Sequence, residues 1–571
     1  MSIQPHELPS YTDFDSVIEL FELQALRFKD NVLLHYQLVN SMEFRALTYG
    51  QVNEITTYLA NSWKSMLHDK TQCIATLSDD PAQCMLAFFT ALKLNVSYFP
   101  VSTHCSEAAI SHLLKETNTG FLIATPTNGA KARKCAAAVY DLKIGVKIWD
   151  GFDVDQLVAT ATAVSTPPAD EYDYSREKRR RVMSRDPTAT VTWLHSSGTT
   201  SAFPKPIPHS TRSYMYVVIE IILSSIQNNS PDLAMDSTDV MLITEKMFHA
   251  PAVYLFGATV LISSAIELEQ LAEYLQQTSF DYRVTLERFK FTLCHGAPLR
   301  QPIGNLMRSQ GLNIQNAYGM TEVGCLSLSD VSRSNDKNWH SIKPTSASMR
   351  YMSFEPFNND MYQLVVHSNC PSLPSVAANL PNGDFTTKDL FIEDQPGSGT
   401  WTFVGRTDDL LLMSTGEKVN PLPLEKEICK EAIIRKCIVV GENRPSTAVL
   451  VELKVSEALS YSPVKIISTV YEAVHRANKH APFHGTVAVP DMVYILPLNK
   501  QLPTTPKGSV SRKKVITDFE QEIQLILYDS NFLSDIVCAG GHKRLVSCVR
   551  NALTEQSSVA RPERSHTPTF L

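Results

Sequence analysis

A loop rich in hydroxyl side chains is the segment of this sequence best suited to chemistry. It runs from His195 to Pro206, reads H-S-S-G-T-T-S-A-F-P-K-P and follows a short predicted strand. Its backbone N–H groups, its hydroxyls and the ammonium group of Lys205 can together surround a polyphosphate. The loop lacks the G-x-x-x-x-G-K-[ST] pattern of a Walker loop. Taken alone, it is equally well explained by an ordinary turn.

Other polar segments offer the remaining groups that a nucleotide and its metal ion need. A tight turn at Thr321 and Glu322 combines a hydroxyl with a carboxylate, which suits a phosphate and its Mg²⁺ ion. Asp389, in a predicted loop, can accept hydrogen bonds from the vicinal hydroxyls of a sugar. Each segment is a weak signal alone, but their order and spacing together are specific. The segments are Asn316–Glu322, Thr386–Asp389, Gly405–Asp409 and Leu502–Arg512.

Together these motifs resemble those of the adenylate-forming, or AMP-binding, superfamily, which contains acyl-CoA synthetases, luciferases and the adenylation domains of nonribosomal peptide synthetases. The resemblance extends from Leu47 to Arg512. Within the superfamily, the chain most resembles the adenylation domain of fungal nonribosomal-synthetase-like carboxylic acid reductases. This narrower resemblance rests on His195-Ser196-Ser197, on Pro204-Lys205-Pro206, on the Lys507–Arg512 ending and on residues 354–366.

The resemblance implies a reaction in two steps. A carboxylate attacks the α-phosphorus of ATP, which gives acyl-AMP and pyrophosphate, and the acyl group then passes to a thiol. Because two anions must approach each other, the site needs cations and N–H dipoles held in a fixed geometry. The implied cofactors are ATP or AMP and Mg²⁺, with coenzyme A as one acceptor.

Four residues match the catalytic positions of the family. Lys507 would supply the cation of the adenylation step, with Lys500 as the alternative. His249 would lie beside the carboxylate and the nucleotide. Thr321 would contact the α-phosphate, and Glu322 would bind Mg²⁺.

A larger set of residues matches the nucleotide-binding positions. The loop after His195 would hold the β- and γ-phosphates. Asn316 and Ala317 would flank the adenine and the acyl pocket, and Asp389 with Arg406 would hold the ribose. Asp408 would be the hinge about which a small domain turns between the two half-reactions. The full set is Ser196, Ser197, Gly198, Thr199, Thr200, Lys205, Asn316, Ala317, Tyr318, Asp389, Gly405, Arg406 and Asp408.

Two positions depart from the family pattern. Ser201 stands where the phosphate loop usually has glycine, and the loop is one residue longer before its Pro-Lys pair. Glycine allows a positive φ or a close approach of the backbone, which serine allows less readily. Lys507 precedes Gly508, whereas the family usually has the order reversed. These departures leave an alternative open, in which the chain is a catalytically impaired relic that binds a nucleotide or a partner.

The substrate and the acceptor are inferred from groups that the sequence lacks. Amino-acid-activating domains carry an aspartate near Phe248 and His249 for the α-ammonium group, and Met247–Pro251 holds no carboxylate. Because a buried unpaired ammonium is costly, we expect an acid without an α-amino group. Residues 529–571 hold no Gly-x-Asp-Ser-Leu attachment site and no reductase fingerprint. We therefore expect a stand-alone unit, serving secondary metabolism, whose acceptor in trans is coenzyme A or a phosphopantetheinyl carrier protein.

The elements that must position these groups follow an α/β pattern. Thr48 and Gln51 have the spacing of a capping box at a helix start. Beyond them, apolar strands such as Cys73–Leu77 and Ser97–Val101 alternate with helices, which is typical of a mostly parallel sheet covered on both faces. We expect a large N-terminal domain over 1–407, with βαβ-type sheets and a β-barrel-like portion. A small mobile α+β lid over 408–527, with a helix over Pro463–Asn478, and a polar, partly disordered tail over 528–571 should follow.

Composition excludes other classes of function. The 571 residues carry a formal charge of −7, which argues against a broad nucleic-acid-binding surface. The basic run Arg176–Arg181 fits a solvated loop better than a nuclear address or a phosphate patch. Eleven cysteines without C-x-x-C spacing indicate neither a zinc site nor a disulfide framework. Met215–Ile226 predicts a buried helix too short for a bilayer, and we expect a cytoplasmic protein without a membrane span.

Overall fold

The computed structural model divides the chain into two compact units. The N-terminal unit comprises Met1–Glu355, Leu364–Thr387 and Glu393–Thr402, and the C-terminal unit comprises Pro356–Gln363, Lys388–Ile392 and Phe403–Leu571. The domain boundaries predicted from the sequence stay a prediction. The residues that the structure describes are 10–13, 15–37, 44–68, 71–149, 157–161, 186–195, 203–229, 242–243, 260–277, 289–329, 338–358, 360–479, 481–482, 485–504 and 510–532.

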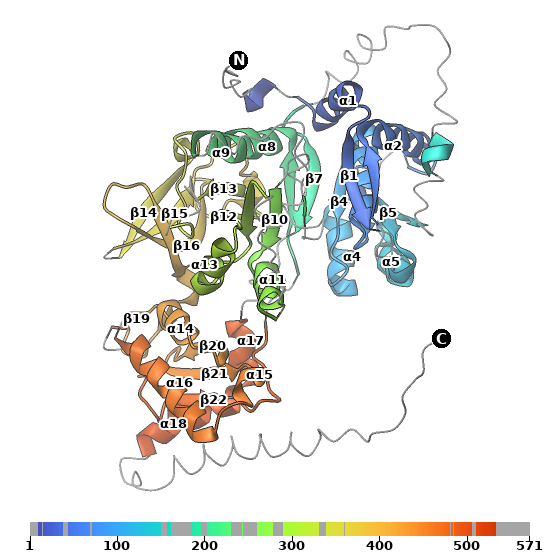
Figure 1. The fold of residues 1–571 in the computed structure, drawn as a ribbon. Coiled ribbons are helices and arrows are strands. Elements are labelled where there is room, and N and C mark those ends of the chain that lie inside the picture. Colours follow the sequence, from blue (N-terminus) through green and yellow to red (C-terminus); the bar gives the residue numbers. More distant parts are fainter. Residues whose placement is uncertain are drawn as a thin grey trace, which may run out of the picture. The chain divides into compact units, whose positions relative to one another are not determined.

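A six-stranded sheet in the N-terminal unit has the order β6-β5-β3-β4-β7-β8, and Figure 1 labels its strands β4, β5 and β7. Neighbouring strands are parallel from β6 to β7, and β8 runs antiparallel to β7 at the edge. The strands are β3 (Cys73–Leu77), β4 (Ser97–Pro100), β5 (Thr119–Ala124), β6 (Gly145–Ile148), β7 (Thr190–His195) and β8 (Pro206–Ser210). The helices among them are α2 (Tyr49–Lys64), α3 (Pro81–Lys93), α4 (Glu107–Glu116) and α5 (Gly129–Ala137).

Helices cover both faces of this sheet, as the alternation of elements predicts. Phe99 of β4 packs in one buried cluster with side chains of α4 and α5. Its neighbour Tyr98 points the other way, because successive strand residues face opposite sides, and its ring lies 5.7 Å from that of Phe88 in α3. At the start of α2, the Thr48 hydroxyl accepts from Gln51 N–H and the Gln51 side chain accepts from Thr48 N–H, so the predicted capping box is confirmed.

A second sheet in the same unit has the order β13-β12-β11-β10-β9. Strands β9 to β12 are parallel, and β13 returns antiparallel to β12. The predicted buried helix at 215–226 is present, with π-helical backbone over Tyr216–Leu223 between α8 (Thr211–Met215) and α9 (Ser224–Asn229). The other elements are β9 (Leu242–Ile243), β10 (Val260–Ser264), α11 (Ala265–Gln277), β11 (Phe291–His295), α13 (Gln301–Ser309), β12 (Ile314–Met320) and β13 (Gly324–Leu328).

Strands β14 to β17 occupy the region expected to be barrel-like. They form an open four-stranded sheet of order β14-β15-β16-β17, with no barrel closure among the described strands. The division between the two units runs through the strands of this sheet. The strands are β14 (Met352–Asn358), β15 (Met361–Val366), β16 (Phe385–Glu393) and β17 (Trp401–Arg406). The predicted α/β class is confirmed.

The rest of the C-terminal unit is the expected α+β fold. Its sheet has the order β20-β21-β22, with β20 and β21 antiparallel and β21 and β22 parallel. Helix α16 spans Pro463–Asn478, as predicted, and buries Ile466, Val470 and Val474 against the sheet core. The other elements are β18 (Leu411–Leu412), β19 (Lys418–Val419), α14 (Leu422–Ile428), β20 (Ile434–Val440), β21 (Ala448–Leu453), α15 (Val455–Ala458), β22 (Val493–Ile495), α17 (Arg512–Asp518) and α18 (Glu520–Phe532).

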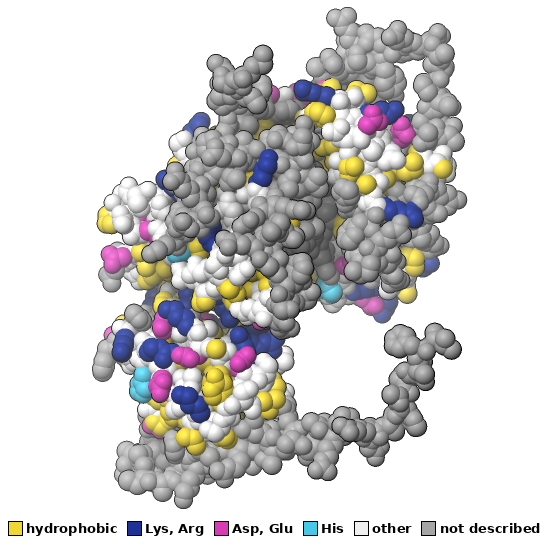
Figure 2. All heavy atoms as spheres, viewed as in Figure 1, with side chains coloured by type: hydrophobic (Ala, Val, Ile, Leu, Met, Phe, Trp, Pro, Cys, Tyr) yellow, Lys and Arg dark blue, Asp and Glu magenta, His cyan; other side chains and the backbone are white. Residues whose placement is uncertain are grey.

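Surface charge and helix hydropathy bear on nucleic-acid and membrane partners. On the visible face of the C-terminal unit, basic and acidic side chains are interspersed (Figure 2). Among the described residues, no helix is both long and apolar enough to cross a membrane.

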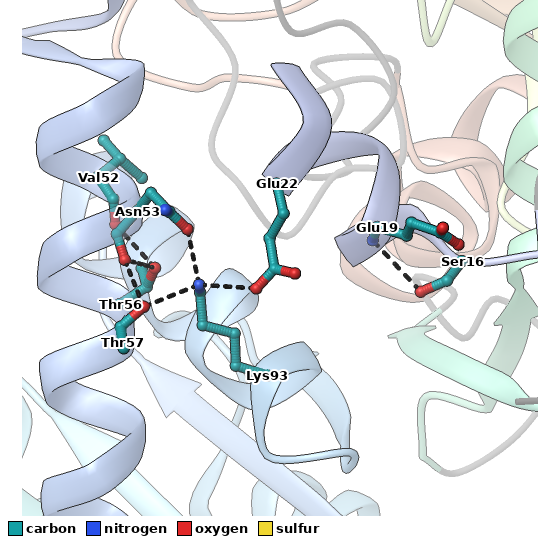
Figure 3. Close-up of polar contacts among 8 residues, drawn as sticks. All are labelled: Ser16, Glu19, Glu22, Val52, Asn53, Thr56, Thr57 and Lys93. Carbon is teal, nitrogen blue, oxygen red and sulfur yellow. Dashed lines mark hydrogen bonds and ion pairs between the residues drawn. The ribbon is translucent and has the colours of Figure 1, made fainter. Parts of the chain in front are cut away.

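A buried lysine joins three helices of the N-terminal unit (Figure 3). Lys93, at the end of α3, donates from Nζ to Glu22 Oε1 at 3.0 Å, Asn53 Oδ1 at 2.7 Å and Thr57 Oγ1 at 3.0 Å. Glu22 belongs to α1 (Val17–Arg27), and the other two belong to α2. The Lys93 side chain is 8% exposed, so its ammonium group depends mainly on these partners rather than on water.

We expect Lys93→Met to lower the free energy of unfolding by about 1–3 kcal/mol, because it removes the donor that Glu22, Asn53 and Thr57 share. Lys64→Met is the matched control, since Lys64 also ends a helix but is exposed, and it should change stability by less than about 0.5 kcal/mol. Denaturant unfolding measures both. Equal losses in the two variants would contradict the assigned role of the cluster.

Candidate functional site

The polyphosphate loop predicted from the sequence is anchored at both ends. Strand β7 ends at His195, β8 begins at Pro206, and these two residues are paired across the sheet. The His195 ring accepts at Nε2 from Ser102 N–H, 3.2 Å away, which ties the start of the loop to the end of β4. Lys205 donates from Nζ to the Val376 carbonyl oxygen at 2.5 Å.

Several predicted site residues lie outside the described residues. They are Ser196, Ser197, Gly198, Thr199, Thr200, His249 and Lys507. Their assigned roles stay predictions.

The segment from Asn316 to Glu322 is brought to one edge of the second sheet. Parallel pairing of β12 with β11 ends at Asn316, whose side chain donates to the His340 carbonyl oxygen at 3.0 Å. Strand β12 then continues through Ala317 and Tyr318 as half of a hairpin with β13, and Thr321 and Glu322 form the predicted turn. The carboxyl ends of parallel strands are the usual place for ligands in such sheets.

Glycine is required in this hairpin. A Cβ at Gly319 would lie 2.4 Å from the Gly324 carbonyl oxygen and 2.7 Å from Cys325 Cα. Both neighbours are backbone, so neither can turn aside. The close crossing of the two strands sets the path of the chain into Thr321 and Glu322, and so depends on the missing side chain.

The Glu322 carboxylate is half-buried and makes no hydrogen bond or ion pair with any other described residue. A metal ion therefore does not have to displace a protein partner in the described part of the chain. One carboxylate is also a sufficient protein contribution for Mg²⁺, which usually keeps waters and binds substrate phosphates. The turn thus fits the predicted metal position, with Thr321 beside it.

A buried histidine near the loop was missed by the sequence analysis. His209 of β8 is 1% exposed, and its Nε2 atom lies 3.1 Å from the Thr321 carbonyl oxygen. Burial lowers its pKa to about 4, so the ring is neutral at pH 7. The sequence offered one signal: Ile207 and His209 are two residues apart, so in a strand they share a face, and in β8 that face is buried.

The residues predicted to hold the ribose lie together in the C-terminal unit. Arg406 donates from its guanidinium to Asp389 Oδ1 at 2.8 Å, and it lies 3.7 Å from Asp408 Oδ2. Lys388 approaches Asp408 at 3.2 Å. Asp389 is 5% exposed. The expectation of a loop at Asp389 was wrong, because this residue lies inside β16, which is paired on both sides.

The segment that contains Lys507 is also anchored at both ends. Leu502 N–H donates to the buried Glu452 carboxylate at 2.8 Å, and Ser511 N–H donates to the Pro503 carbonyl oxygen at 2.8 Å. The alternative cation, Lys500, lies outside this anchored stretch and contacts Glu522 Oε1 at 2.7 Å.

Comparison with known families supports one assignment. The family model for AMP-binding enzymes matches residues 21–280, and the model for the AMP-binding enzyme C-terminal domain matches residues 408–531. The chain belongs to the AMP-binding enzyme family. The predicted superfamily is confirmed.

Individual relatives of this AMP-binding enzyme agree with the assignment. An adenylate-forming reductase of Serpula lacrymans is 29% identical over 252 residues, which are 43% of this chain and 22% of that protein. The chain thus matches less than a quarter of that relative's length. This relative also agrees with the predicted fungal reductase branch.

Solved structures share the fold. An anthranilate CoA ligase in complex with anthranoyl-AMP has a TM-score of 0.66 and 15% identity, and the match covers 89% of this chain and 99% of that one. The A-PCP didomain of a carboxylic acid reductase from Segniliparus rugosus, in complex with AMP, has a TM-score of 0.64 and 13% identity over 91% and 82% of the two chains.

We expect Gly319→Ala to lower the rate of acid-dependent pyrophosphate release by about 10²-fold, because a shift of about 1 Å in a positioning element costs that much. Gly397→Ala is the control, since its added Cβ meets no atom within 4 Å. That control should lose about 1–2 kcal/mol of stability through its positive φ but keep its rate. A Gly319→Ala enzyme of normal rate would contradict the requirement for glycine.

Proposed function

We propose that this chain activates a carboxylic acid with ATP, giving acyl-AMP and pyrophosphate, and then transfers the acyl group to a thiol. The observation that carries the proposal is the contact of His209, on the strand leaving the polyphosphate loop, with the Thr321–Glu322 turn. Two segments that suit phosphate groups are thereby held together within one compact unit. Such an arrangement suits a triphosphate with its metal ion better than a single anion.

Each group has a defined task in the adenylation step. The loop residues and Lys205 neutralise the β- and γ-phosphates, and Thr321 donates to the α-phosphate. Glu322 holds Mg²⁺, which screens the phosphate charge that otherwise repels the incoming carboxylate. Lys507 supplies a further cation at the α-phosphate, where negative charge develops. His249 orients the carboxylate.

The sugar is recognised separately. Asp389 bonds Arg406 through Oδ1, and its buried carboxylate would accept hydrogen bonds from the ribose hydroxyls. Arg406 holds the carboxylate in one orientation through a charge-assisted hydrogen bond. Asn316, Ala317 and Tyr318 lie beside the adenine ring of the bound nucleotide.

The acid and the acceptor follow from the sequence around these groups. We propose an aryl, fatty or polyketide-type acid, since Met247–Pro251 provides no carboxylate for an α-ammonium group. The thiol comes from outside residues 1–571, because this sequence holds no Gly-x-Asp-Ser-Leu attachment site. Coenzyme A and a phosphopantetheinyl carrier protein both fit, in a cytoplasmic pathway of secondary metabolism.

The second candidate is an impaired enzyme that binds nucleotide without turning it over. The observation that favours it is Ser201, which stands at a position where glycine permits close backbone approach. In that case the fold retains nucleotide binding, and the chain acts through a partner.

The decisive experiment measures pyrophosphate release with ATP and Mg²⁺ across a panel of aryl and aliphatic acids. We expect acid-dependent release that Lys507→Ala lowers by about 10²-fold or more, as removal of one electrostatic stabiliser does. Lys500→Ala is the matched control, because Lys500 lies nearby in sequence and already pairs with Glu522. A larger loss in Lys500→Ala would reverse the assignment. If folded protein binds ATP but releases no pyrophosphate with any acid, the impaired enzyme is favoured.

The acceptor is identified by a second assay on the active acid. With coenzyme A as the sole thiol, a coenzyme A ligase forms acyl-CoA, which is detected by mass. An enzyme that loads carriers forms none, and acylates only a protein bearing the phosphopantetheine arm. Hydrolysis of acyl-AMP as the sole outcome with either thiol would contradict the thiol-transfer step.

A further inference from the structure

We propose that His209 is a positioning residue that holds the Thr321–Glu322 turn against β8, the strand that follows the polyphosphate loop. The proposal rests on the proposed adenylation function and adds a residue to it. Among the described residues, His209 makes no hydrogen bond to the Glu322 carboxylate. It acts through the backbone of Thr321.

The contact joins two sheets of the N-terminal unit. His209 lies on β8, the edge strand of the six-stranded sheet, and pairs with Thr192 of β7. Its Nε2 atom lies 3.1 Å from the Thr321 carbonyl oxygen, in the turn between β12 and β13 of the five-stranded sheet. Since β8 begins one residue after Lys205, the same short strand carries both the end of the loop and this contact.

The direction of the hydrogen bond follows from its partners. A carbonyl oxygen only accepts, so Nε2 must carry the proton and donate. The neutral ring then has a lone pair on Nδ1, which lies 3.4 Å from the Ser213 hydroxyl and can accept its proton. Both ring nitrogens therefore face partners that fit a single tautomer. Tautomer and ring orientation are thus held by the protein itself.

A fixed separation matters because of the ligand. The α-phosphate and the γ-phosphate of ATP are separated by a chain of P–O–P links with limited reach. The loop and the turn bind opposite ends of the triphosphate. They come from different sheets and lie more than 110 residues apart in the sequence. Without a direct tie between the sheets, small independent movements would change the distance between the two sets of contacts, and misplacement of about 1 Å costs about 10²-fold in rate.

Three variants separate positioning from packing. His209→Leu keeps the volume and loses the donor, His209→Asn places its donor nearer the Nδ1 position, and His209→Gln can reach the Nε2 position. We expect His209→Leu and His209→Asn to raise KM for Mg·ATP and lower kcat for pyrophosphate release, together about 10- to 100-fold in kcat/KM. His209→Gln should restore kcat/KM to within about fivefold. Thr90→Val is the stability control, because its equally buried hydroxyl bonds only within its own helix.

The second half-reaction distinguishes positioning from a general structural role, because a structural defect would slow both half-reactions. Supplied acyl-AMP needs no triphosphate, so acyl transfer to the thiol should stay near the wild-type rate in His209→Leu. Equal losses in both half-reactions, matched by a loss of stability, would overturn the proposal. So would a His209→Leu enzyme with normal KM and kcat for Mg·ATP.

Direct binding keeps this test separate from the proposed function. Calorimetric titration with Mg·ATP should give a weaker Kd for His209→Leu than for wild type and His209→Gln, whether or not the enzyme turns over. Wild-type protein that binds Mg·ATP without releasing pyrophosphate would refute the proposed function alone. An unchanged Kd in His209→Leu, or wild-type protein that binds no Mg·ATP, would refute the role of His209.

Discussion

A ligand with several linked phosphates requires that protein groups from distant parts of the chain keep a constant separation, and this constraint explains much of the N-terminal unit. Strands β7 and β8 close the polyphosphate loop at its base, and the β12–β13 hairpin presents Thr321 and Glu322. The donor of His209 joins these two parts through a part-buried hydrogen bond. The His209 ring itself is buried, and a buried donor that loses its acceptor costs about 1–3 kcal/mol.

Two other buried polar groups also fix one segment of the chain against another. Lys93 joins three helices, and the Glu452 carboxylate receives both the Leu502 N–H and the Arg435 guanidinium. A buried charge gains little net stability over an apolar replacement, because its desolvation offsets most of the attraction. Its main effect is to fix the relative position of the segments, since only one arrangement satisfies all its hydrogen-bond partners. In this protein the buried polar groups therefore specify position more than they add stability.

The sequence predicted the elements whose signals are local. Apolar strands alternating with helices gave the α/β class, and the capping box at Thr48 and the helix at Pro463–Asn478 were found as expected. Asp389 was expected in a loop, whereas it lies in β16, a strand held by its neighbours β15 and β17 on both sides. His209 was missed because its partner is remote in sequence. The roles of Lys507, His249 and the loop residues stay predictions.

The ion pairs of the candidate site differ in burial. The Asp389–Arg406 pair is suited to hold a fixed geometry, whereas Asp408 is suited to a hinge. Asp389 is almost fully buried against Arg406, so its orientation is fixed. Asp408, the proposed hinge, is 44% exposed, and its partner Lys388 is 39% exposed. Exposed pairs contribute only about 0–1 kcal/mol. Lys388 also has a positive φ of 62°, which costs a non-glycine residue additional free energy. Contacts this weak break more readily than the buried Asp389–Arg406 pair, which is what the proposed hinge at Asp408 requires.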